Sequence, residues 1–115
     1  MALLRLQFAE FSPPLEGNQL VLSVGETQTV AAKVVVEDCS HCRVDLIASA
    51  EHFSLIMGEK DTEIGGGTFD RKLEWQLQAI APGDHLSIQV EATADEKYQT
   101  TMVSVRIHPR LRIED

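Results

Sequence analysis

The sequence predicts an all-β fold, an antiparallel two-sheet sandwich of about seven strands. Three observations predict it. Apolar and polar residues alternate with a period of two along most of the chain, which is typical of half-buried strands. The β-branched residues that strands prefer occupy 24 of the 115 positions, as 10 Val, 7 Ile and 7 Thr. Turn-forming residues recur roughly every 8–12 positions, which is the strand spacing of a sandwich.

Length, composition and charge indicate a single folded domain. A chain of 115 residues has room for one hydrophobic core, so residues 1–115 are expected to form one domain. Leu, Ile, Val and Phe together are 33 of the 115 residues, above the roughly one-fifth below which a charged chain stays disordered, so a folded chain is expected. The formal net charge of -8 repels phosphates and anionic lipids, so neither nucleic acid nor a membrane is an expected partner. No signal peptide or spanning segment is recognisable, and a cytoplasmic location is expected.

Three short strands are expected in the first half of the chain. Residues 4–8 alternate, and Pro13 and Pro14 follow as a break, because proline cannot donate to a strand ladder. Residues 20–24 alternate in the same way, and residues 53–57 are a further short candidate.

A hairpin and a loop are expected between and after these strands. Residues 30–36 and 44–48 alternate on either side of residues 38–41, which resemble a turn, so the two segments are expected to pair as a hairpin. Residues 58–68 contain three consecutive glycines and several charges, which predicts a mobile loop. The glycines do not open a helix, and this argues against a phosphate-binding loop.

The clearest alternation lies in the second half. Residues 73–79 and 86–92 flank a turn with Pro82 and Gly83, which predicts two half-buried antiparallel strands. A turn at residues 95–97 precedes a last strand over residues 101–107. The expected core consists of the apolar residues on one face of each strand: Leu20, Leu22, Val34, Val36, Val44, Leu46, Leu73, Trp75, Leu77, Leu86, Ile88, Val90, Val103 and Val105.

Trp75 has two interpretations. An exposed indole could stack on a sugar, whereas an indole in register with Leu73 and Leu77 packs in the core. The register favours the core.

The strand pattern, with Trp75 before the Pro82 turn and an alternating strand over residues 86–90, resembles an immunoglobulin-like or fibronectin type III-like bacterial β-sandwich module. The resemblance covers the whole chain and implies the sandwich fold. Three departures stand out: the only cysteines, Cys39 and Cys42, are too close in sequence to bridge two sheets, Trp75 lies late, on the expected fifth strand, and His85 stands where such domains have a tyrosine. An antibody-type or receptor-type role is therefore not implied.

Cys39 and Cys42 are the residues with the greatest chemical potential. Two thiolates at this spacing can chelate Zn²⁺ or oxidise to a disulfide. A structural zinc site needs four ligands, so His41, another histidine or a second subunit would have to complete it. The expectation is reduced thiols in a turn without a metal or other cofactor, and the candidate metal ligands are Cys39, His41 and Cys42.

The main functional expectation is a non-catalytic protein-interaction or spacer module of a larger signalling or effector protein. No triad, metal quartet or phosphate loop is recognisable, so neither catalytic residues nor enzyme activity is expected. The expected partner is a protein or a second copy of the chain, bound through an edge strand at residues 4–8 or 101–107. The alternative is a small metal- or redox-responsive domain that uses the Cys39 and Cys42 pair.

Overall fold

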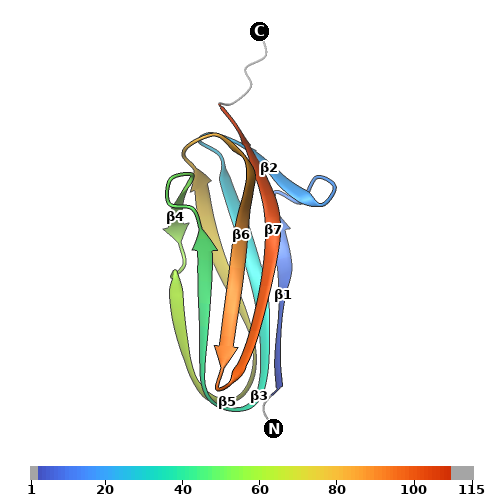
Figure 1. The fold of residues 1–115 in the computed structure, drawn as a ribbon, viewed down its shortest axis with the longest axis vertical. Helices are drawn as coiled ribbons and strands as arrows, with labels where there is room; N and C mark the ends of the chain where they lie inside the picture. The colour runs from blue at the N-terminus through green and yellow to red at the C-terminus, as the bar shows by residue number, and fades with distance from the viewer. Residues whose placement is uncertain (1–2, 110–115) are drawn as a thin grey trace.

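Seven strands make up the computed structural model, which describes residues 3–109 (Figure 1). They are β1 (Leu3–Ser12), β2 (Gln19–Ser23), β3 (Thr27–Ala48), β4 (Phe53–Met57), β5 (Asp61–Ala79), β6 (Gly83–Ala94) and β7 (Lys97–His108). The predicted all-β sandwich with about seven strands is confirmed. No helix with the length and apolar character needed to cross a membrane occurs among the described residues.

Two long strands belong to both layers of the sandwich. The first part of β3, residues 27–36, pairs with β1 on one side and with residues 69–78 of β5 on the other, and β4 borders β5. The last part of β3, residues 42–48, pairs with β6, which is followed by β7 and β2. The strand pairs are antiparallel except that of β2 with β7, which is parallel. β3 and β5 therefore run from one layer into the other (Figure 1).

The hydrophobic core lies between these layers. The expected core residues are buried, except Leu73 and Leu86, which are partly buried and pack against the others. Trp75 is 1% exposed, and its indole N–H donates to the carbonyl of Glu59 at 2.8 Å. The prediction that Trp75 packs in the core is confirmed, because the only polar atom of the ring has a partner inside the protein.

The hairpin expected around residues 38–41 is instead one continuous strand. These residues lie within β3, at a bulge where Glu37 and Asp38 together oppose Thr68 of β5. Asp38 has a positive φ of 54°. The prediction of a turn was wrong because a bulge uses the same backbone conformation, and the same residue types, as a tight turn.

The expected mobile loop over residues 58–68 is largely a strand. β5 begins at Asp61, and its residues 65–67 pair with residues 39–41 of β3. Glycine weakens an isolated strand, but it also allows another backbone to approach closely. The prediction from composition was wrong because that tertiary requirement is not visible in the local sequence.

The last strand, expected to be an open edge, is covered on both sides. β7 pairs with β6 along most of its length, and its residues 104–108 pair with β2 on the other side. β1 pairs with β3 alone, so it remains an edge strand.

The segments 73–79 and 86–92 do not pair with each other, since β5 and β6 have different partners there. The Pro82 turn therefore connects the two layers instead of closing a hairpin.

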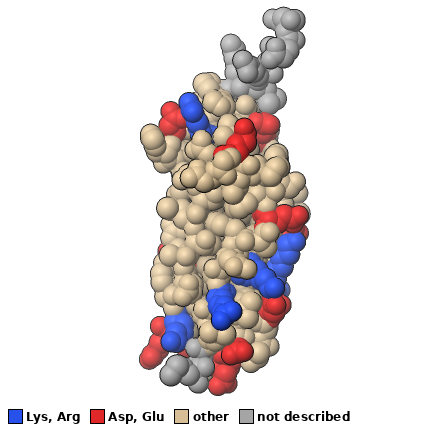
Figure 2. Space-filling view, turned by 90° about the vertical axis from the view of Figure 1, so that its right-hand side faces the viewer, with Lys and Arg blue, Asp and Glu red and all other residues tan. Residues whose placement is uncertain are grey.

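Charged side chains are mixed on the surface. On the face in Figure 2, Lys and Arg side chains gather on the lower part and lie among Asp and Glu side chains. Ion pairs join Lys33 to Asp70 at 3.3 Å and Lys72 to Glu10 at 3.1 Å. On the face in Figure 2, the basic side chains are therefore interspersed with carboxylates.

Candidate functional site

The bulge in β3 places Cys39 in the core. Inward-facing residues of the first part of β3 have even numbers up to Val36, and the additional residue in the bulge moves the inward position to Cys39. After the strand bends into the second layer, Cys42 and Val44 face inward. Cys39 is 6% exposed and Cys42 is 0% exposed, and both are free thiols within the same core cluster.

The glycine segment of β5 covers this part of β3 with backbone alone. Gly67 pairs with Cys39 and has a φ of +121°. At Gly66, a Cβ atom would lie 2.7 Å from the carbonyl oxygen of Cys39 and would collide with the carbonyl oxygen of Ser40. The close approach of the two strands therefore requires glycine at position 66.

The turn between β6 and β7 is attached to the same stretch of β3. Both carboxylate oxygens of Asp95 accept the backbone N–H of Ser40 at 3.0 Å, and one of them also accepts the N–H of His41 at 3.1 Å. The N–H of Asp95 donates to the carbonyl of His41 at 3.1 Å. We refer to these four bonds as the Asp95 contact. It holds the backbone between the two cysteines in an extended conformation.

The surroundings of Cys42 favour the protonated form of its thiol. The Cys39 Sγ–H donates to the carbonyl of Gly67 at 3.5 Å. Burial, followed by the electrostatic influence of the neighbouring Cys39 and of the Asp95 carboxylate, raises the pKa of Cys42 to about 11. Cys42 is therefore a neutral thiol at physiological pH, and it becomes a nucleophile only when its surroundings open.

His41 does not join the two cysteines. Its side chain is exposed on the surface, where Nε2 lies 4.0 Å from a carboxylate oxygen of Glu63. His52, His85 and His108 lie at the other end of the sandwich, near Gly83. Cys42 pairs with Ala94, which is at the opposite end of β6 from Gly83. At the usual rise per residue, the two ends of this 12-residue strand are about 35 Å apart.

The described residues therefore assemble no metal centre with three or more His, Cys, Asp or Glu ligands. The three candidate ligands expected from the sequence are separated into a buried pair, Cys39 and Cys42, and an exposed His41. The sequence interpretation missed Asp95 and Gly66. An aspartate in a turn is too common to signal such a contact, whereas three adjacent glycines inside a chain of strands are a usable signal of close backbone approach.

Comparison with known proteins gives a structural likeness without a sequence relative. No family model matches the sequence, and no curated protein matches it. The fold is similar to the cupredoxin domain of amoB from Nitrosocaldus yellowstonii, with a TM-score of 0.59 and 11% identity, over 96% of this chain and 92% of that one. It is also similar to a FixG-related protein from Vibrio parahaemolyticus, with a TM-score of 0.52 and 18% identity, over 96% of this chain and 97% of that one.

These likenesses confirm the coarse fold and contradict one expectation. The chain has a cupredoxin-like β-sandwich, which is an immunoglobulin-like type of fold. The expectation of a non-catalytic interaction or spacer module is wrong by this comparison, since a neighbour that matches over nearly its whole length is a cupredoxin domain.

Proposed function

We propose that the chain is a thiol-based redox-responsive domain, in which oxidation of Cys39 and Cys42 changes the conformation of β3. The observation that carries this proposal is the burial of both thiols in one strand, under a side-chain-free segment and the Asp95 contact. One structural neighbour is a cupredoxin domain, and cupredoxins bind copper and transfer electrons.

A cupredoxin-type copper site does not fit the residues of this chain. Such a site takes two histidines and a cysteine, with a weak axial ligand. Here three of the four histidines lie at the opposite end of the sandwich from the cysteines, and His41 is exposed. Within the metal- or redox-responsive alternative, thiol oxidation is therefore the chemistry that the described residues support.

The two thiols are expected to react in a defined order. Cys39 is the more accessible, so its thiolate attacks a low-molecular-weight disulfide first, and one thiolate of the reagent leaves. Cys42 then loses its proton to solvent and attacks the mixed disulfide, which releases the second reagent thiolate. Two protein thiols and one reagent disulfide thus give one protein disulfide and two reagent thiols.

Disulfide formation requires β3 to contract. Residues three positions apart in an extended strand have Cα atoms about 10 Å apart, whereas a disulfide needs about 4.4–6.8 Å. The backbone at Ser40 and His41 has to buckle, and this breaks the Asp95 contact. The signal would therefore be a local rearrangement where β3, β5 and the turn between β6 and β7 meet.

Treatment of the reduced protein with oxidised glutathione tests the proposal. We expect mass spectrometry of tryptic peptides to show a disulfide between Cys39 and Cys42, and NMR spectra to change at residues 38–42, 65–67 and 95–96. Cys42→Ser is expected to stop at a glutathione adduct on Cys39, and Cys39→Ser to react much more slowly. Absence of any adduct or disulfide in the native protein, under conditions that fully oxidise the urea-unfolded chain, refutes the proposal. Elemental analysis of the same preparation provides the control for a bound metal.

Within the immunoglobulin-like class, we propose a fibronectin type III-like subtype. Its support is the succession of seven strands with short connections in an all-β sandwich, although Trp75 lies later in the chain, on β5, than the tryptophan of immunoglobulin domains. An experimental structure superposed on both subtypes would test it, and a better fit to antibody-type domains would contradict it.

A further inference from the structure

An apolar hollow of about 130 Å³ opens on the flank of the sandwich where β3 loses its β5 neighbour. Pairing of β3 with β5 ends at Asp45, so residues 46–48 pair with β6 only. The hollow reaches the core, because Leu46, Phe53 and Leu77 at its floor are 5% exposed or less. Its apolar lining consists of Leu46, Ala48, Ala50, Phe53, Leu55 and Leu77.

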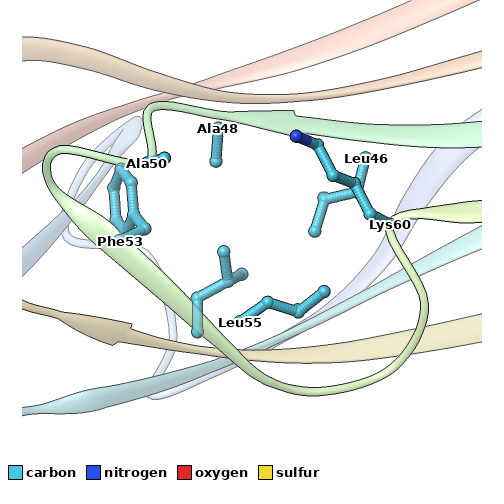
Figure 3. A pocket seen from close by; sticks show the side chains of 7 residues that line it. Leu46, Ala48, Ala50, Phe53, Leu55 and Lys60 are labelled. Atoms are coloured by element: carbon cyan, nitrogen blue, oxygen red, sulfur yellow. The ribbon is translucent and has the colours of Figure 1, made fainter.

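Lys60 supplies a cation at the rim of this hollow. Figure 3 shows its side chain crossing from the loop toward β3, with the nitrogen between Leu46 and Ala48. Within residues 3–109, no carboxylate forms an ion pair with this ammonium group at 4.0 Å or less. The charge of Lys60 helps to lower the pKa of the neighbouring Asp61, but the two groups form no ion pair in the part of the chain that the structure describes. An ammonium group beside an apolar hollow favours a ligand with one negative charge and an apolar body.

The backbone of β3 adds a hydrogen-bond donor at the same rim. The N–H of Leu46 points toward the β5 side, where it donates to the carbonyl of Lys60 at 2.8 Å. In an antiparallel strand the N–H groups of alternate residues point to the same side, so that of Ala48 points past the end of β5. Because β5 no longer pairs there, this N–H is available to a ligand in the hollow.

We propose that this hollow binds a small aliphatic or aromatic monocarboxylate. A cavity of this volume holds an apolar group about as large as a benzene ring. The apolar body contacts Phe53, Leu55 and Leu77, and the carboxylate lies between the ammonium of Lys60 and the N–H of Ala48. The site is independent of the cysteines and of the redox function proposed above.

Titration of the protein with hexanoate, followed by ¹H–¹⁵N NMR, tests this site. We expect saturable shifts at Ala48, Phe53, Leu55 and Lys60, and weaker binding at higher salt because the ion pair is partly exposed. Hexanol, which has the same chain without the charge, is expected to bind more weakly. Absence of saturable shifts at these residues overturns the proposal.

Three variants separate a built site from general surface binding. Lys60→Gln is expected to weaken hexanoate binding about threefold to fivefold, which is typical of an exposed ion pair. Lys97→Gln, at the turn between β6 and β7, removes an equal charge elsewhere and is expected to leave binding unchanged. Ala50→Phe places a ring at the exposed rim and is expected to abolish binding while the rest of the spectrum stays folded. Equal effects of the two lysine variants, or undiminished binding by Ala50→Phe, contradict the proposed site.

Discussion

The carboxylate of Asp95 accepts the backbone N–H of Ser40 with both of its oxygens, each at 3.0 Å, across 55 positions of sequence. Ser40 lies between the two cysteines in β3, so this bond ties the turn between β6 and β7 to the strand that carries both thiols. Among the described residues, no other side-chain hydrogen bond joins the turn between β6 and β7 to β3.

Asp95→Ala is expected to destabilise the protein by about 1–2 kcal/mol, because the N–H groups of Ser40 and His41 lose a charged acceptor. Urea denaturation followed by circular dichroism measures this change. Asp95→Asn is the matched control, because asparagine keeps an acceptor oxygen and tolerates the φ of 53° at this position. An Asp95→Ala midpoint equal to that of the wild type would show that the contact contributes nothing.

Gly66→Ala is expected to lower the free energy of unfolding by more than about 2 kcal/mol. The new Cβ collides with the backbone of Cys39 and Ser40, and this backbone cannot move freely within a packed pair of strands. Gly65→Ala is the neighbouring control, since a Cβ there has no atom within 4 Å. Thermal unfolding of the two variants distinguishes them. Equal melting temperatures would contradict the close approach of β3 and β5.

Trp75→Ala is expected to lower the free energy of unfolding by about 3–5 kcal/mol. Removal of the large, fully buried ring leaves a cavity, and the carbonyl of Glu59 loses its hydrogen-bond donor. The wild-type indole is also expected to emit at short wavelength and to resist quenching by acrylamide. Trp75→Phe retains most of the apolar volume and should lose less. A cost below about 1 kcal/mol for Trp75→Ala would place the ring at the surface.

Stability is expected to fall between about pH 9 and pH 11. The folded protein holds the Cys42 proton up to its raised pKa of about 11, whereas the unfolded chain releases it near 9.0. The folded state therefore binds more protons in this window, and its advantage, about 1–3 kcal/mol, is complete below pH 9 and is lost as pH rises through 11. Urea midpoints of the wild type and Cys42→Ala, compared from pH 8 to pH 11, measure it. The variant is expected to show a shallower decline, and parallel declines would contradict the pKa shift.

Outside residues 38–41 and 58–68, the positions of the strands and the composition of the core were predictable because they depend on local alternation. Residues 53–57 alternate weakly, yet they match β4 residue for residue, and Trp75 lies on the face that its register with Leu77 predicts. Alternation reports which face of a strand is buried, and burial is what determines the stability of a sandwich.

Strand partners and the environment of the cysteines were not predictable from the same pattern. Asp38 has the residue type of a turn, but pairing with Thr68 and its neighbours keeps it inside β3. The burial of Cys39 and Cys42 depends on Gly66 and Asp95, which lie 24 or more positions away along the chain. Such long-range contacts leave no periodic trace in a single sequence, so both the bulge and the covered thiol pair required the structure.

The 22-residue strand β3 also determines how the molecule comes apart. Since one half of β3 belongs to each layer, neither layer can dissociate and keep a complete set of backbone partners. Partial opening would have to begin at the strands with a single partner, which are β1 and the two five-residue strands β2 and β4. Amide protons along the centre of β3 should then exchange with deuterium together, at the rate of global unfolding, and the two layers should melt in a single step.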